Sequence, residues 1–68
     1  MPTIRVEMLP GRTTAQKKVL AANLTQVMIE HANASPASVH VIFTEVEPND
    51  WAVAGELLVE RLKPASGN

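Results

Sequence analysis

The hydrophobic pattern of the chain changes its period twice, and this succession restricts the folds that are open to it. Apolar and polar residues alternate from Thr3 to Met8, which is the pattern of a strand with one buried face. From about Thr14 to Ala32 the apolar residues recur at helical spacing instead. From Val39 to Val46 the chain is rich in β-branched residues and too short for a second long helix. The order strand, helix, strand predicts an α/β fold.

Both ends of the predicted helix carry boundary signals. Thr13 and Gln16 have the spacing of a capping box at a helix start. Asn33 tolerates the left-handed conformation that commonly ends a helix, and Pro36 cannot continue one. The apolar stripe of this helix consists of Leu20, Leu24, Val27, Met28 and His31. A histidine on such a stripe is more often packed or interfacial than catalytic.

A β-α-β unit of this kind joins parallel strands through a right-handed crossover, but two strands alone do not make a stable sheet. The core is also thin, because Phe43 and Trp51 are the only aromatic residues among the 46% of the chain that is hydrophobic. Cysteine is absent, and His31 and His40 have no acidic residue at ligand spacing, so neither a disulfide nor a structural metal is expected. We therefore expect the protomer, a single domain over residues 1–68, to dimerise into a four-stranded sheet.

The C-terminal third is predicted to be less regular. Glu47 to Asp50 is a turn cluster, and Trp51 to Leu58 is predicted to form a loop or a hairpin arm that can dock on a neighbour. Leu57 to Leu62 has the composition of a short helical turn, and Pro64 to Asn68 that of a frayed tail.

Charge and hydropathy narrow the classes of partner. Six Lys and Arg against seven Asp and Glu give a formal net charge of -1, which provides no electrostatic footprint for nucleic acid or an anionic membrane. The N-terminus does not have the pattern of a signal peptide, and no stretch reaches the ~20 apolar residues of a membrane span. We expect a soluble, cytoplasmic protein.

Pro2 directly after Met1 is the feature most suggestive of chemistry. If Met1 is trimmed, Pro2 has a free secondary amine, which becomes a useful general base when burial or nearby cations lower the pKa of such an amine towards the working pH. Taken alone, a proline that merely starts a strand is the more common interpretation.

Other segments of the chain strengthen the functional interpretation of Pro2. The chain resembles the 4-oxalocrotonate tautomerase family from Pro2 to about Leu62 in an ordered set of segments, namely Pro2 opening a strand, Gly11-Arg12-Thr13, Gln16-Lys17, Ser38-Val39-His40-Val41-Ile42 and, after an aromatic residue, Ala54-Gly55-Glu56-Leu57. The resemblance implies an isomerase that moves a proton in unsaturated 2-oxo or 2-hydroxy acids, as in the degradation of aromatic compounds, without a cofactor. It also implies a homohexamer built as a trimer of dimers.

The resemblance assigns roles to four residues. Pro2 matches the catalytic base, and Arg12 matches an arginine that holds a substrate carboxylate and polarises the conjugated system. Trp51 stands where the family commonly has a Phe that lines the pocket. His40 stands where many members have an arginine supplied by a neighbouring subunit, so this cation is missing here. A substrate with one carboxylate is therefore expected to be preferred over a dicarboxylate.

Two alternatives stay open at this point. The chain fits a non-catalytic binding module of the same fold, in which Pro2 is dispensable. It also fits a hydratase or dehalogenase relative, although Val53 stands where some of those enzymes have the carboxylate that activates water, with Asp50 and Glu56 nearby in sequence.

Overall fold

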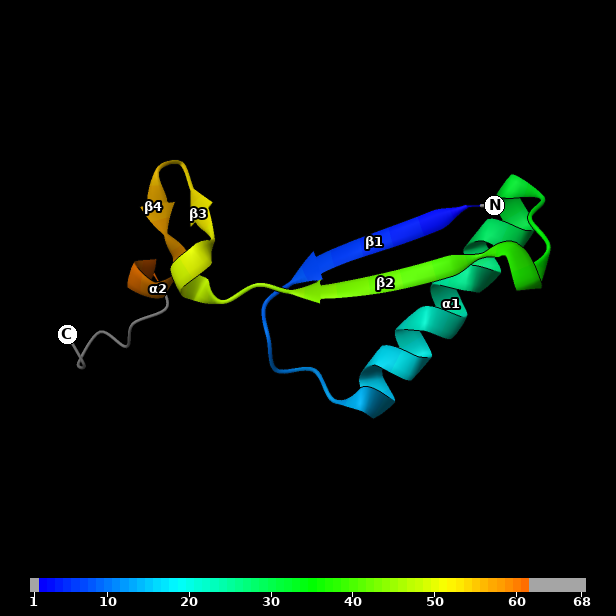
Figure 1. Cartoon of the computed structure of the whole chain (residues 1–68), viewed down its shortest axis with the longest axis horizontal. Coiled ribbons are helices and arrows are strands. Elements are labelled where there is room, and N and C mark those ends of the chain that lie inside the picture. Colours follow the sequence, from blue (N-terminus) through cyan, green and yellow to red (C-terminus); the bar gives the residue numbers. More distant parts are fainter. Residues whose placement is uncertain (1, 62–68) are drawn as a thin grey trace.

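The computed structural model describes residues 2–61, and in this range the predicted α/β fold is confirmed. Strand β1 (Thr3–Met8) leads through a loop to helix α1 (Thr14–Ala32), and a 3-10 turn, η1 (Pro36–Ser38), leads to strand β2 (His40–Glu45) (Figure 1). The two strands pair in parallel over their whole length, from Thr3 opposite His40 to Met8 opposite Glu45. The observed β2 is one residue shorter at each end than the stretch predicted from the sequence.

Helix α1 begins and ends as its sequence predicts. The Thr13 hydroxyl accepts a hydrogen bond from the Gln16 amide at 3.1 Å, and the Gln16 side chain accepts one from the Thr13 amide at 2.8 Å. These bonds satisfy two amide groups that the first turn of a helix leaves without partners. Asn33 ends the helix in the left-handed conformation, with φ at 55°. The capping box and the Asn33 cap are both confirmed.

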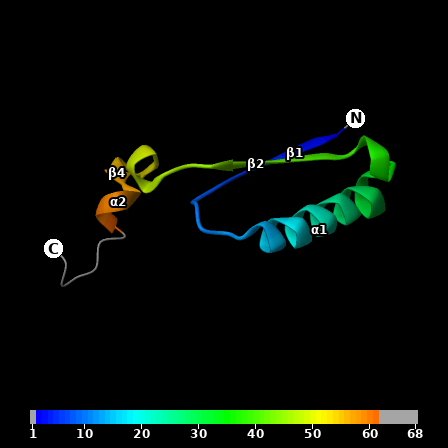
Figure 2. The same ribbon diagram turned by 60° about the horizontal axis from the view of Figure 1, so that its bottom comes forward.

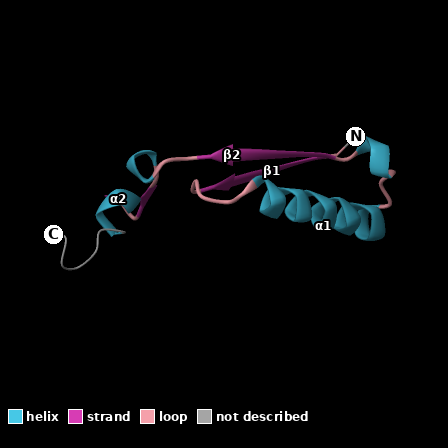
Figure 3. Cartoon of the chain, turned by 90° about the horizontal axis from the view of Figure 1, so that it is seen from below, coloured by secondary structure: helices cyan, strands magenta, loops and turns pink. Residues whose placement is uncertain are grey.

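Helix α1 covers one face of the two-stranded sheet and leaves the other face open (Figures 2 and 3). The covered face has the half-buried apolar side chains of β1 and their partners in register, and Lys17 of α1 reaches it to pair with Glu45. The opposite face, hereafter the open face, consists of Thr3, Arg5, Glu7, His40, Ile42 and Thr44. No described element packs on the open face.

The apolar stripe of α1 is only partly covered within one protomer. Leu24 and Met28 are half-buried, Leu20 and Val27 are 38% and 50% exposed, and the His31 side chain is 76% exposed. The half-buried residues of the helix are Lys17, Ala21, Leu24, Thr25, Met28 and Ile29. The apolar residues of α1 lie on more than one side of the helix, so one protomer cannot cover them all.

The predicted C-terminal arm is present as a separate small structure. After a second 3-10 turn, η2 (Pro48–Asp50), strands β3 (Ala52–Val53) and β4 (Glu56–Leu57) form an antiparallel hairpin followed by helix α2 (Leu58–Arg61). Ala54 and Gly55 both have positive φ, which is the backbone of a type I′ two-residue turn. This arm, residues 47–61, projects beyond the end of the sheet (Figure 1). Leu62 and the tail predicted for Pro64 to Asn68 lie outside the described residues.

The protomer has no core of its own. None of the residues from 2 to 61 is buried, and Val19, Val53 and Leu57 are 60%, 44% and 43% exposed. The radius of gyration is 16.0 Å, whereas a compact domain of this length has about 11 Å. So much uncovered apolar surface on an extended chain indicates that the stable form contains further copies or another partner. Within residues 2–61, no helix combines the length and apolar character needed to cross a membrane.

Candidate active site

The four residues singled out from the sequence lie in three separate places within one protomer. Pro2 and His40 are at the start of the two strands, Arg12 is in the loop after the end of β1, and Trp51 is in the arm. One protomer therefore does not bring these four residues together in a single site.

Pro2 and His40 are neighbours across the sheet. The His40 amide donates a hydrogen bond to the Pro2 carbonyl oxygen at 2.9 Å, which extends the parallel ladder by one step beyond Thr3. Proline is tolerated at the start of a strand because its missing N–H is not needed there. Pro2 is half-buried, while His40 is exposed on the open face. The backbone of Pro2 is thus fixed, with its nitrogen at the outer end of the strand.

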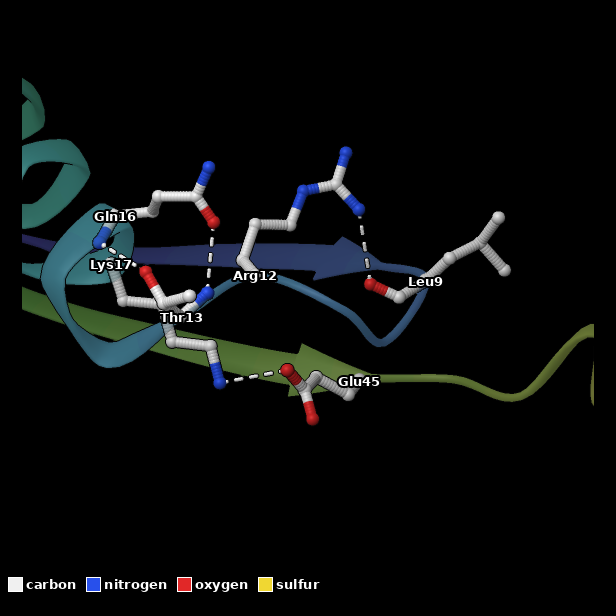
Figure 4. A network of polar contacts seen from close by, with 6 residues as sticks. All are labelled: Leu9, Arg12, Thr13, Gln16, Lys17 and Glu45. Atoms are coloured by element: carbon white, nitrogen blue, oxygen red, sulfur yellow. Dashed lines mark hydrogen bonds and ion pairs between the residues drawn. The ribbon is translucent and has the colours of Figure 1, made fainter.

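Arg12 lies at the other end of β1, in the loop that leads into α1 (Figure 4). Gly11 before it has φ at +128°, a conformation that residues with a side chain rarely adopt. The Arg12 Nη1 donates to the carbonyl oxygen of Leu9 at 3.2 Å, closing the loop on itself. A guanidinium has five N–H donors in a fork that suits a carboxylate, so most of this exposed side chain's donors stay available.

The start of α1 is tied to the end of β2 beside this loop. Lys17 Nζ lies 2.7 Å from Glu45 Oε2, and the two side chains are 30% and 36% exposed (Figure 4). Glu45 stands opposite Met8, the last residue of β1 before the loop. The contact therefore connects both ends of the segment that contains Arg12.

Two surface hollows contain candidate residues. One, of about 530 Å³, is lined by Arg12, Ala15, Gln16, Val19 and Leu20, and so combines one cation with an apolar floor. The other, of about 330 Å³, lies where the arm leaves the sheet and is lined by Glu7, Val46, Asp50, Trp51 and Ala52.

The second hollow contains a residue that sequence reasoning missed. Glu7 was interpreted only as a polar residue of the alternating strand, yet it lines the same hollow as Trp51 and Asp50. Its place near the end of β1 and on the open face was the available signal. Two carboxylates beside an indole form a setting that can hold a cation or orient water.

Pro2 and Arg12 of one protomer cannot act on the same small molecule. A strand of six residues spans about 20 Å, and Pro2 and Arg12 lie beyond its two ends. A proton-transfer base must be within hydrogen-bond distance of the group that it deprotonates, directly or through one water. A site that uses both residues must therefore combine them from different copies of the chain.

Comparison with known proteins adds to this geometry. Residues 2–61 match the family model described as tautomerase enzyme. A probable tautomerase of Ralstonia nicotianae is 40% identical over 60 residues, which cover 88% of this chain and 92% of the relative.

Solved structures of tautomerases are also similar to this chain. The structure of YwhB, a homologue of 4-oxalocrotonate tautomerase, superposes with a TM-score of 0.84 at 36% identity over 87% of this chain and 97% of the other. A heterohexameric 4-oxalocrotonate tautomerase from Chloroflexus aurantiacus gives a TM-score of 0.83 at 36% identity, covering 93% of this chain and all of the other.

Proposed function

Because this chain belongs to the tautomerase family of isomerases, we propose that it moves a proton between atoms of an unsaturated 2-oxo or 2-hydroxy acid, with the Pro2 amine as the general base. The base takes one proton from the substrate, from the hydroxyl of an enol or from a carbon, and returns one proton to a different atom of the conjugated system. The product is then an isomer of the substrate, and neither an oxidant nor a reductant is needed.

The proposed base requires that Met1 be removed. While Met1 is attached, the Pro2 nitrogen belongs to an amide and has no available lone pair, but after removal it is a secondary amine. The half-buried ring and the 2.9 Å hydrogen bond from the His40 amide to the Pro2 carbonyl hold this amine in one place. A fixed base can approach a bound substrate repeatedly in the same orientation.

One observation supports most directly a site shared between two copies of the chain: the whole length of β1 separates Pro2 from Arg12. We place Arg12 of a second copy beside Pro2 of the first, where its guanidinium holds the substrate carboxylate and draws electron density towards one end of the conjugated system. Its positive charge there would also favour the neutral form of the Pro2 amine. In this arrangement Arg12 lowers the pKa of the Pro2 amine only from a neighbouring subunit.

Assembly is part of the same proposal. In the described residues, β1 and β2 pair only with each other, so each strand has a free edge at which a second copy can extend the sheet to four strands. Three such dimers would form a homohexamer. Exposed apolar residues on α1 and on the arm, and a structural neighbour that is a heterohexamer, support an assembly larger than a dimer.

Substrate choice follows from the number of cations in the proposed site. Arg12 pairs with one carboxylate, while the second carboxylate of a dicarboxylate would face His40 or water at a desolvation cost. Trp51 is proposed as the wall that keeps water away from the reacting carbons. We therefore expect a higher kcat/KM for phenylenolpyruvate or 2-hydroxypenta-2,4-dienoate than for 2-hydroxymuconate at neutral pH.

One observation favours a second candidate activity. Glu7 and Asp50 lie beside Trp51 in one hollow, so a carboxylate that could activate water is present even though Val53 stands at the usual position. Addition of water to an unsaturated acid is the reaction that this arrangement would support. Glu56, the other nearby carboxylate, is paired with Arg61 at 3.3 Å.

Pro2→Ala tests the proposed function. The variant should lose at least about a hundredfold in kcat on phenylenolpyruvate, since general base catalysis contributes on that order or more, and should assemble as the wild type does in sedimentation velocity. Pro36→Ala, which changes an exposed proline outside the strands, is the matched control. Full activity in Pro2→Ala, or an intact mass that includes Met1 in active protein from its native host, would contradict the assignment of Pro2.

A further inference from the structure

The loop that contains Arg12 is held at both ends. On the strand side, Met8 is paired in register with Glu45, and the Val46 amide donates to the Met8 carbonyl at 2.9 Å. On the helix side, the Lys17 amide donates to the Thr13 carbonyl at 3.0 Å within the first turn of α1. The segment from 9 to 13 is thus short, and its shape depends on where α1 starts relative to the strands.

A single polar contact fixes that start. Over residues 2–61, the pair between Lys17 Nζ and Glu45 Oε2 is the one ion pair or side-chain hydrogen bond that joins α1 to the sheet. The rest of the helix rests on half-buried side chains, none of which is fully buried in the protomer. Apolar contacts of this kind are not directional, so they allow small sliding movements of the helix. The ion pair fixes its position at the end nearest Arg12.

We propose that Lys17 and Glu45 are positioning residues, which set the place of the Arg12 guanidinium by fixing the start of α1 against the end of β2. This role rests on the proposed function, in which Arg12 binds the substrate carboxylate. Neither residue touches the substrate. The pair also occupies the Glu45 carboxylate with Lys17, while Arg12 forms no ion pair within residues 2–61 and so stays available for the substrate.

The proposal predicts a specific kinetic effect. A small displacement of Arg12 weakens mainly its hold on the carboxylate, which the substrate and the transition state share, and loss of such uniform binding raises KM. Its pull on the conjugated system weakens less, so kcat falls only slightly. Removing the pair should therefore raise KM for phenylenolpyruvate about fivefold and leave kcat within about twofold, because partly exposed ion pairs have modest effects. A purely structural role would instead lower stability and leave KM unchanged.

Lys17→Met removes the charge and keeps a long apolar side chain, and Glu45→Gln removes the other charge with little change in shape. Lys18→Met is the matched control, because Lys18 is the next residue on the same helix, is exposed, and has no ion pair within the described residues. Lys17→Arg and the double exchange Lys17→Glu with Glu45→Lys should restore KM to within about twofold of wild type. Sedimentation velocity checks that each variant assembles.

A second measurement does not depend on turnover. In ¹H–¹⁵N NMR spectra, the Arg12 Nε–H signal should shift or broaden in Lys17→Met and Glu45→Gln and stay in place in Lys18→Met. If KM and this signal are both unchanged in the pair variants, or if kcat falls while KM stays constant, the positioning role is wrong. If the wild type turns over no such acid, the proposed function fails, and the Arg12 signal alone then decides whether the pair positions Arg12.

Discussion

The β-α-β unit and the arm differ in what can hold them in shape. The unit has a capped helix of 19 residues and six register pairs between its strands. The arm has two strands of two residues and a helix of four. Elements this short do not persist in water without a surface to pack on. The unit thus has local signals and internal pairing that set its shape, although a two-stranded sheet still needs further strands to be stable, whereas we expect the arm to depend almost entirely on another copy.

The largest expected effect comes from charging the arm. Leu57 is 43% exposed in the protomer, and we expect another copy to cover it. Leu57→Asp should break the assembly, because an unpaired charge in an apolar interface costs several kcal/mol, on the order of 3 or more. Sedimentation velocity over a range of concentrations measures this effect.

Leu57→Met keeps the apolar character and volume of the side chain and is the control for that substitution. It should sediment as the wild type does. If Leu57→Asp assembles as well as Leu57→Met, the arm does not use this face for assembly, and its dependence on another copy must rest on other residues.

The next effect concerns the β-α-β unit. Phe43 is half-buried on the face covered by α1, opposite Val6 in register. Phe43→Ala should lower the free energy of unfolding by about 2 kcal/mol, less than for a fully buried Phe. Urea unfolding at one fixed protomer concentration measures this change, because dissociation and unfolding are linked.

Phe43→Leu should cost less than about 1.5 kcal/mol and serves as the conservative control. The comparison between the two regions predicts that Phe43→Ala unfolds more easily but still assembles when folded. Dissociation of folded Phe43→Ala would show that packing within the unit and assembly through the arm are coupled.

The smallest effect is expected on the open face, away from the arm. His40→Arg supplies a second permanent cation and should raise kcat/KM for 2-hydroxymuconate about tenfold, which corresponds to about 1.4 kcal/mol. The value for phenylenolpyruvate should change less than about threefold. Steady-state kinetics on both substrates measures the difference.

His31→Arg is the matched control, because it makes the same substitution at an exposed histidine on α1. An equal gain for both substrates, or the same gain in His31→Arg, would mean that His40 lies outside the site. A wild type that already prefers the dicarboxylate would point to another cation in the pocket, such as Arg5 or Arg61.

Most of the fold was predictable because its signals are local. The helix boundaries depend on residues that act within one helical turn, namely Thr13, Gln16 and Asn33. The alternation of polar and apolar residues in β1 identifies the strand and its two faces. The covered side of α1 was less predictable. Leu20 and Val27 are as apolar as Leu24, so the sequence alone does not show which of these side chains face the sheet and which are left for contacts with another copy.

The arrangement of the candidate site was predictable only in part. Nine residues separate Pro2 from Arg12, and six of them form an extended strand, so the rise per residue alone implied that one chain could not bring them together. The approach of Glu7 to Trp51 had only a weak signal, the place of Glu7 near the end of β1, because it also depends on the direction in which the arm leaves the sheet.

The distance between Pro2 and Arg12 also has a consequence for gene duplication. If each site takes its base from one chain and its cation from another, a duplicated gene can lose Pro2 in one copy and Arg12 in the other. Neither product alone would form a complete site, but an assembly of both products would contain some complete sites. Two such genes would then be selected together, and loss of either would abolish the activity of both.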